Sequence, residues 1–489
     1  MRSTMRIQQI SLAAAISAKD PVSPQQIDQA TRAQERKTFQ ASLESSAQTE
    51  HSSLVSLYSF SPHPLLLSHQ QLLQLKQFNV ALSIAITNIV ERWWTDEEAG
   101  FPLRMPLDPH EDSLLQWVEK ATEEKLIPPF NVRNGFWPPD FLLESKTERF
   151  LICEINARFP FELLPLAMYG HQALSNIGTQ QKLYGPATDP NKVLNDLCLA
   201  FDLGLPIHIL TGTERSSSLD LFLLLIERQT GAAPNVISFS DLRLVENKHS
   251  ITGYDLCCLR NHSSKSNGRS GTLQGESLGE IHQIVLQCNQ NELLELPQEI
   301  LRHLALNSVN DMRSIFLVHD KRLLGIILQE LNDLVNKHSV LTPKQAHILQ
   351  EGIAPTIISG SSELEELVRQ SAQSNKIKDG FIVKPARLGD NEGIIFGRDL
   401  SAEQWTSVVM SLRTLGSDQC IIQHLVNQHV FEIFLHEEKG VQKEHLVGTY
   451  HVIDGNFSGL GIWRTGSGRL SSVENGGGSW LVSILSLLG

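Results

Sequence analysis

The chain reads Asp140-Phe141-Leu142-Leu143, then a polar turn from Glu144 to Arg149, then Leu151-Ile152-Cys153-Glu154-Ile155-Asn156. Two short apolar stretches joined by a polar turn predict an antiparallel β-hairpin. This hairpin would carry a carboxylate on its first strand and the pattern Glu-x-Asn at the end of its second strand.

Three side chains of the hairpin are predicted to meet. Successive side chains of a strand alternate between faces, so Glu154 and Asn156 should point the same way while Ile152 and Ile155 help to bury the backbone. Antiparallel pairing would bring Asp140 beside them. A compact set of oxygen ligands is of the kind that Mg²⁺ prefers, with positions left open for phosphate oxygens. The alternative is a surface hairpin with three unrelated polar residues.

Composition excludes some classes of protein. The 489 residues are 41% hydrophobic and 19% charged, which is ordinary for a globular protein. This length suffices for roughly two to four domains. The net charge of −13 argues against a nucleic-acid binder, because such proteins neutralise phosphate with an excess of Lys and Arg. A nucleotide enzyme needs only a few local cations and is not excluded.

The sequence also bears on the compartment. Six cysteines without a Cys-x-x-Cys spacing predict free thiols in a reducing environment. No apolar run reaches the roughly 18–20 residues that span a bilayer, so we expect no membrane partner. Arg2, Arg6 and a short apolar patch up to Ile16 are too short and too polar for a secretory signal. We expect a cytoplasmic protein, and a mitochondrial presequence is the alternative.

The chain divides into four predicted regions. Residues 1–52 are rich in Gln, Ser, Ala and Thr and predict a flexible lead-in. Residues 53–190 read as a helical region that ends in the metal-binding hairpin. Residues 195–305 alternate strands with an apolar helix at 219–229, which predicts an α/β accessory domain with a largely parallel sheet. Residues 306–489 begin with helices and continue with short strands.

The last region holds lysines suited to phosphate. Lys321 opens an apolar helix, and the buried strand 380–385 delivers Lys384 near its end. A lysine in that place, before a loop with Gly389 and Gly393, neutralises phosphate as a point charge. The loop lacks the GxxxxGK[ST] pattern, so a P-loop NTPase is not indicated.

A further strand is suited to a nucleotide base. The stretch 420–423 is apolar up to Gln423 and runs into Val426. Backbone groups at such a strand end can pair with the edge of adenine, while Val426 packs on its face. Taken singly, the alternatives are an exposed strand-end lysine for Lys384 and a solvated linker residue for Gln423.

In this order the motifs resemble the ATP-grasp superfamily, and more closely its circularly permuted branch, which includes glutathionylspermidine-synthetase-like ligases. The usual arrangement has the lysines and the adenine strand first, whereas here Asp140 precedes Lys321. The closing segments GLGIWR (459–464) and ENGGG (474–478) are similar to that branch as well. The resemblance implies an α/β (α+β) ATP-grasp fold. Its metal-binding half would be N-terminal, its Rossmann-like α/β accessory domain central, and its ATP-binding half C-terminal.

The resemblance also implies a reaction and a role for each residue. ATP and Mg²⁺ would serve a ligase that joins a small-molecule carboxylate to an amine through an acyl phosphate, with an amino acid or peptide as one substrate. Asp140, Glu154 and Asn156 would hold Mg²⁺; Lys321, Lys384, Gly389 and Gly393 would contact phosphate; Gln423 and Val426 would line the adenine pocket; Arg464 and Arg158 would stabilise the phosphoryl group.

Two other functions stay open. The loop after Lys384 is poor in glycine and carries Asp390 and Glu392, and an apolar tail follows Gly478 where this branch places polar residues. Both features favour a non-catalytic nucleotide-binding relic. The intact Asp/Glu/Asn set argues against a relic, which has no use for metal ligands. A phosphotransferase that stops at the phosphorylated product shares all the chemistry that precedes the amine.

Overall fold

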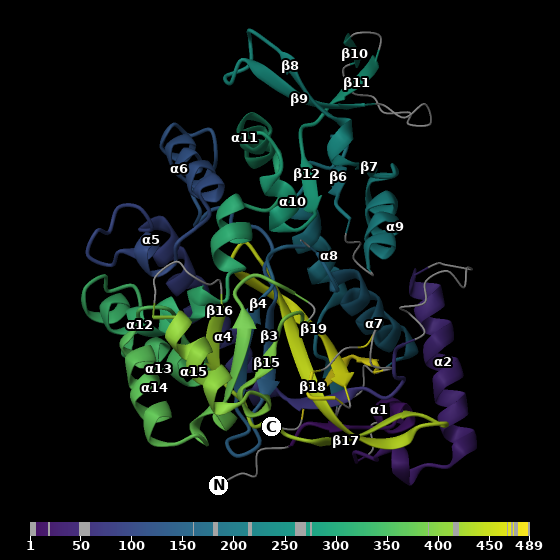
Figure 1. The fold of residues 1–489 in the computed structure, drawn as a ribbon. Helices are drawn as coiled ribbons and strands as arrows, with labels where there is room; N and C mark the ends of the chain where they lie inside the picture. The colour runs from purple at the N-terminus through teal and green to yellow at the C-terminus, as the bar shows by residue number, and fades with distance from the viewer. Residues whose placement is uncertain are drawn as a thin grey trace.

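The computed structural model describes residues 6–17, 20–47, 59–159, 161–178, 184–213, 218–259, 270–273, 276–389, 391–413, 420–466, 468–470, 473 and 478–487. Within these residues the strands form five sheets, and these combine with helices in a mixed α/β fold (Figure 1). Each helix in these ranges is too short or too polar to cross a bilayer.

The largest sheet is antiparallel and contains the predicted hairpin. Its hairpin register sets Asp140 opposite Glu154, as expected. The order is β20 (Trp480–Leu481), β19 (Asn456–Gly466), β18 (Gly440–Ile453), β3 (Pro139–Leu143) and β4 (Phe150–Ile155), and β17 (Phe431–His436) pairs with β18.

A second antiparallel sheet carries Lys384. Two helices, α14 (Ser362–Gln373) and α15 (Ala402–Ser411), pack on it through a core that includes Leu364 and Trp405. This packing leaves the opposite face of the sheet, with Ile382, Lys384 and Gln423, for the site. The strand order is β13 (Thr356–Ile357), β16 (Cys420–His424), β14 (Phe381–Pro385) and β15 (Ile395–Phe396).

The central region contains the predicted parallel sheet. Helix α9 (Leu219–Thr230) connects two of its strands, and all pairings in it are parallel. Its order is β12 (Ile284–Gln287), β6 (His208–Thr211) and β7 (Asn235–Ile237). A four-stranded antiparallel sheet extends beyond it, at the top of Figure 1: β10 (Ser270–Leu273), β11 (Glu276–Glu280), β9 (Tyr254–Leu259) and β8 (Leu242–Glu246).

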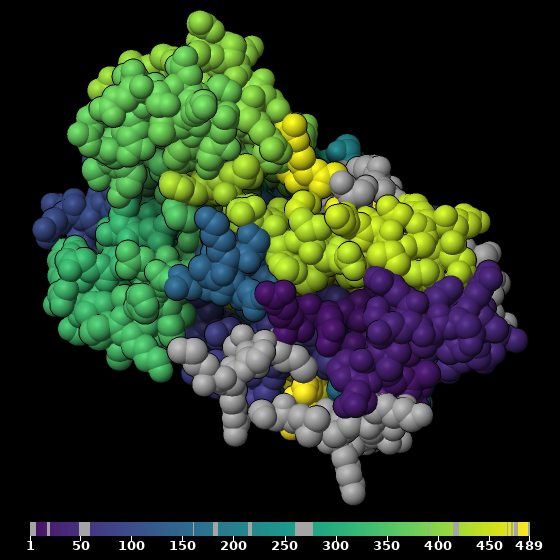
Figure 2. All heavy atoms as spheres, turned by 90° about the horizontal axis from the view of Figure 1, so that it is seen from below, coloured from purple at the N-terminus to yellow at the C-terminus, as the bar shows by residue number. Residues whose placement is uncertain are grey.

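The prediction of a flexible lead-in is wrong for residues 6–17 and 20–47. Helix α2 (Gln29–Ala47) buries Phe39 and Leu43 and packs against α7 (Leu164–Ile177). A mostly polar helix folds here because a narrow apolar stripe is enough to dock it. The short helix α1 (Leu12–Ser17) precedes it. Figure 2 shows this purple N-terminal region lying against the yellow-green C-terminal strands.

The apolar C-terminal tail is part of the core. Strand β21 (Ser483–Ser486) runs parallel to β2 (Leu65–Ser68) and antiparallel to β5 (Tyr184–Pro186), and β1 (Gln8–Gln9) completes the sheet. The apolar tail is therefore a folded part of the protein, and the relic alternative stays open.

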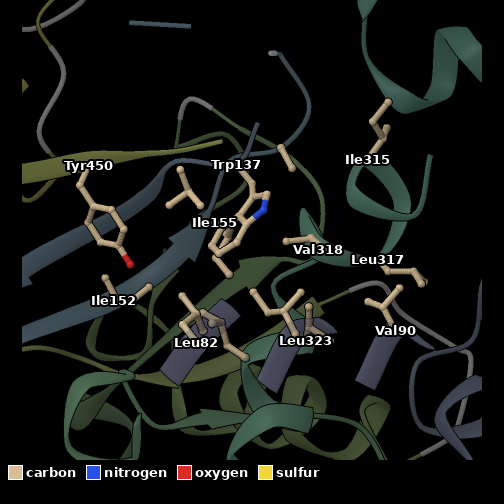
Figure 3. Close-up of a cluster of buried hydrophobic side chains, with 14 of the residues drawn as sticks. Leu82, Val90, Trp137, Ile152, Ile155, Ile315, Leu317, Val318, Leu323 and Tyr450 are labelled. Atoms are coloured by element: carbon tan, nitrogen blue, oxygen red, sulfur yellow. The ribbon is translucent and has the colours of Figure 1, made fainter. Parts of the chain in front are cut away.

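Behind the hairpin lies a large apolar cluster (Figure 3). Ile152 and Ile155 of β4 are buried in it, as predicted, together with Leu82 of α4 (His69–Glu91) and Leu323 of α12 (Arg322–Asn336). This cluster fixes the strand that carries Glu154. The other α-helices in the described ranges are α5 (Phe101–Arg104), α6 (Pro109–Glu123), α8 (Pro190–Leu199), α10 (Gln290–Leu294), α11 (Gln298–Asn307) and α13 (Pro343–Gly352).

Candidate active site

A cavity of about 640 Å³, counting its open mouth, lies between the largest sheet and the sheet of β14 and β16. We call it the inter-sheet cavity. Residues from both sheets line it, which brings together positions far apart in the sequence. Five predicted site residues are among them: Glu154, Lys384, Gln423, Val426 and Arg464.

A β-bulge aims Glu154 into this cavity. Asp140 is paired with Glu154 but Phe141 with Ile152, so Cys153 is an extra residue in β4. Strict alternation would put Ile152 and Glu154 on one face. The bulge instead leaves Ile152 in the core and turns Glu154 toward the cavity, a common use of bulges beside functional sites. The sequence pattern did not predict this feature.

The three predicted metal residues do come together. The Nδ2 of Asn156 donates to Oδ2 of Asp140 at 3.2 Å, and the guanidinium of Arg464 pairs with the same carboxylate oxygen. Asn156 therefore uses its amide nitrogen toward Asp140. Its Oδ1 is left as the atom suited to a cation, as in an oxygen-only metal site.

The pKa values of Glu154 and Asp140 are shifted in opposite directions. Burial favours the neutral form of Glu154, but the charges of Lys321, Lys384 and Arg464 prevail and lower its pKa to about 2. Burial raises the pKa of Asp140 and the charge of Glu154 adds to this, while Arg464 opposes it. Glu154 is thus firmly anionic at neutral pH, which metal binding and interaction with cations both require.

Lys321 joins the carboxylate to the loop that follows Lys384. Its Nζ lies 3.5 Å from Oε2 of Glu154 and donates to the carbonyl of Leu388 at 2.8 Å. Its backbone N–H donates to the carbonyl of Ala386 at 2.9 Å. Lys321 is buried behind the residues that line the inter-sheet cavity rather than being one of them.

The two loop glycines and Arg158 lie outside the lining of the inter-sheet cavity. A Cβ on Gly389 would be 2.9 Å from Nη2 of Arg158, so this glycine gives room to the arginine. Gly393 has φ +68° and packs on Pro385, where a Cβ would meet Cγ at 2.7 Å. It serves the turn. None of the three lines the inter-sheet cavity. A contact of these residues with nucleotide stays a prediction.

The side chain of Gln423 has a structural task that the sequence did not indicate. It is 2% exposed, and its Nε2 donates to the carbonyl of Cys153 at 3.2 Å and to Oγ1 of Thr356 at 2.9 Å. It therefore ties β16 to β4 and to β13. Val426 lines the cavity, in keeping with a place beside a base. Asp390 and residues 474–477 lie outside the described residues.

A buried ion network holds the loop after Lys384, and sequence reasoning missed it. Nε of Arg387 donates to Oδ2 of Asp320 at 2.8 Å, and its guanidinium also pairs with Glu111 of α6. Arg322 donates to the same Asp320 oxygen at 2.7 Å. Asp320 and Arg322 flank Lys321, which is a weak signal, but nothing in the sequence points to Glu111.

Two arginines lie over an aromatic ring that lines the cavity. The guanidinium carbons of Arg469 and Arg398 lie 5.1 Å and 5.4 Å from the centroid of Phe396. Arg469 also pairs with Asp399. Both Phe396 and Arg469 line the cavity. Arg469 is remote from Phe396 in the sequence, so only the fold reveals that contact.

The chain is similar to known proteins in sequence and in fold. The family described as the AnkG N-terminal domain matches residues 78–317. The chain is 37% identical over 482 residues to the ATP-grasp enzyme ankG of Aspergillus thermomutatus, with 96% of this chain and 98% of that protein covered. Its fold is similar to that of a glutathione synthetase-like effector from Globodera pallida in the apo form, with a TM-score of 0.51, 10% identity, and 94% and 98% of the two chains covered. The predicted resemblance is confirmed: the chain belongs to the ATP-grasp enzymes.

Proposed function

We propose that this enzyme is an ATP- and Mg²⁺-dependent ligase that joins a carboxylate to an amine through an acyl phosphate. One observation carries the proposal. Glu154, Lys384 and Arg464 line a single cavity from three different strands, and their charges suit a nucleotide triphosphate with its cation.

The donor set fits Mg²⁺. Glu154 is anionic above about pH 2, Asp140 lies beside it, and the Oδ1 of Asn156 is a neutral oxygen donor. These three residues would hold the ion. When bound, Mg²⁺ neutralises charge on the phosphates and orients them for transfer.

The cations of the site would act on the phosphoryl group. Lys384, near the end of β14, and Lys321 neutralise phosphate charge. Arg464 is held in place by its pair with Asp140 and presents a planar fork to the transferred group. Donors fixed in advance in this way stabilise the charge that develops during transfer.

The reaction would proceed in two transfers. A carboxylate oxygen of the substrate attacks the γ-phosphorus of ATP, the bond to the β-phosphate oxygen breaks, and ADP leaves. The amine nitrogen then attacks the acyl carbon, phosphate leaves, and the amine loses a proton to form the amide. The protein supplies no covalent nucleophile in this scheme. Cys153 lines the cavity but stays a thiol, because burial raises its pKa to about 12.

The substrates would be small molecules, with an amino acid or a short peptide as one partner.

The six cysteines are thiols, which supports a reducing, cytoplasmic location.

Trapping of the acyl phosphate tests the proposal. The enzyme is incubated with ATP, Mg²⁺, hydroxylamine and a panel of amino acids, small peptides and simple carboxylic acids. We expect ADP release that depends on one carboxylate, together with its hydroxamate. ADP release with a phosphorylated product and no hydroxamate would indicate a phosphotransferase. Mg·ATP binding without ADP release from any mixture would favour a non-catalytic relic.

A further inference from the structure

We propose that His319 is a positioning residue that holds the phosphate-side loop against the end of the metal-bearing strand β4. This inference rests on the proposed function for its catalytic consequence. The contact itself belongs to the fold and can be tested without nucleotide.

The imidazole of His319 joins two segments that are far apart in sequence. The backbone N–H of Ala157 donates to its Nδ1 at 3.2 Å, and its Nε2 donates to the carbonyl of Arg387 at 3.1 Å. Ala157 directly follows Asn156, the last of the three predicted metal ligands, and Arg387 belongs to the loop after Lys384. One side chain, 2% exposed, therefore spans both halves of the candidate site.

Only the neutral ring with its proton on Nε2 can make both bonds. Nδ1 must keep its lone pair to accept from Ala157. Burial, followed by the charges of Lys321 and Arg158, lowers the pKa of His319 to about 3. The ring is therefore neutral at physiological pH and both hydrogen bonds are available.

A π-helical turn aims His319 at these partners. The turn Ser314–Val318 (η3) precedes it, and the N–H of His319 donates to the carbonyl of Ser314 at 3.0 Å. Such wide turns often mark functional positions because they redirect the residues that follow. Lys321, two residues further, bonds to the same loop through Ala386 and Leu388. The segment 319–321 thus holds the loop at successive carbonyls.

The expected consequence is a fixed separation between metal ligands and phosphate loop. A nucleotide would contact the Asn156 end of β4 and the loop after Lys384 at once, so a shift of one against the other misplaces the transferred group. Misplacement of about 1 Å costs on the order of 100-fold in rate. His319 touches neither substrate nor metal in this scheme and acts through the two backbone segments.

Three substitutions separate its two bonds. His319→Phe fills the space and removes both. The amide of His319→Asn reaches the position of Nδ1 and can accept from Ala157, whereas the amide of His319→Gln reaches the position of Nε2 and can donate to Arg387. His208→Phe is the matched control, because His208 is also buried and has a pKa lowered to about 4, but it begins β6 in the central sheet.

Hydrogen exchange in the nucleotide-free protein and the Kd of Mg·ATP are then measured for each variant. We expect His319→Phe to speed exchange in the peptides around Ala157 and the loop 386–389, and to raise the Kd about tenfold, with a thermal midpoint near that of the control. His319→Asn should restore protection at Ala157, and His319→Gln should restore it in the loop.

Unchanged exchange and unchanged Mg·ATP affinity in folded His319→Phe protein would overturn the inference, as would an equal loss of affinity in His208→Phe. Wild-type protein that binds no Mg·ATP would overturn the proposed function instead. The exchange data alone would then decide whether His319 holds the loop to β4.

Discussion

Glu154 is the residue on which the charges of the site converge. Glu154→Gln keeps the side-chain shape but removes the anion that Lys321, Lys384 and Arg464 surround. We expect Mg²⁺-dependent ADP release to fall about 100-fold, the usual cost of removing one fixed electrostatic group from an active site. The assay is ADP release at saturating ATP over a range of Mg²⁺ concentrations.

Glu444→Gln is the control for this substitution. Glu444 is a buried carboxylate of β18 that does not line the inter-sheet cavity, so its replacement by an amide leaves the candidate site intact. ADP release by Glu444→Gln should equal that of the wild type. Retention of more than half of the activity by Glu154→Gln would argue against a metal role for Glu154.

For single residues, the sequence predicts the contacts that the geometry of one hairpin determines. Asp140, Glu154 and Asn156 meet because a hairpin brings neighbouring strands together, and that much follows from the alternation of side chains. The bulge at Cys153 interrupts that alternation within the hairpin and leaves no residue pattern of its own. The buried hydrogen bond from Gln423 to Cys153 joins residues that are remote in sequence. Such tertiary contacts leave no periodic signal.

At the scale of elements, the Arg387 network connects α6, the start of α12 and the loop after β14. Arg387→Met would leave Glu111 buried without this cation and Asp320 with Arg322 alone. Breaking a buried ion pair costs about 3–5 kcal/mol. We expect a loss of this order in the free energy of unfolding, measured by urea denaturation.

Arg413→Met gives the comparison for a surface pair. Arg413 bonds to Glu365 with both side chains largely exposed, so its loss should change the free energy of unfolding by about 1 kcal/mol or less. Equal urea midpoints for the Arg387 and Arg413 variants would contradict a stabilising role for the buried network.

The C-terminal strand β21 allows a similar paired test. Ile484 is 1% exposed between β2 and β5, and Ile484→Ala should cost about 2–5 kcal/mol through the cavity it leaves. Leu487 follows the strand and is 53% exposed, so Leu487→Ala should change the free energy of unfolding by no more than about 0.5 kcal/mol. A negligible effect of Ile484→Ala on thermal unfolding would show that the tail does not stabilise the fold.

The elements were predictable to different degrees. The hairpin, the strand with Lys384 and the parallel central sheet follow from apolar runs between turn signals. The docked helix α2 does not, since its composition is polar and Phe39 and Leu43 are its two large apolar side chains. Strand β21 was also missed, because its partners come from distant parts of the chain.

For the whole molecule, buried histidines predict acid sensitivity. In the folded protein four of them have pKa values lowered by burial to about 3 or 4, against 6.5 for the ordinary side chain. The unfolded chain then binds more protons than the native one below about pH 6.5, so stability is full above that pH and falls as the pH drops toward 4. The four are His171, His208, His319 and His451.

Each of these histidines contributes up to about 1.4 kcal/mol per pH unit in that window. Carboxylates with lowered pKa values, such as Glu154 and Asp320, act in the same sense as the histidines. Among the described residues, five carboxyl groups whose pKa values burial raises act in the opposite sense: Asp112, Glu119, Asp140, Glu444 and Asp454. We expect the thermal midpoint to fall between pH 7 and pH 4.5, and to fall less steeply in His208→Phe. A midpoint that is constant or rises on acidification would contradict this expectation.

The sequence shows the order of the metal-binding and ATP-binding segments along the chain. It does not show how these two segments come to line one cavity. Glu154 and Lys384 line one cavity although they belong to separate sheets. The prediction of a shared site came from the order of motifs in the family that the chain resembles. In the structure, interactions of Lys321, Gln423 and His319 join the two segments, which are remote in sequence.

Isothermal titration of ATP into the wild-type protein, once with Mg²⁺ and once with the cation chelated, tests the central claim most directly. We predict saturable binding with a Kd in the micromolar range in the presence of Mg²⁺, and much weaker binding without it. Absence of binding in the presence of Mg²⁺ would contradict a nucleotide site between the two sheets.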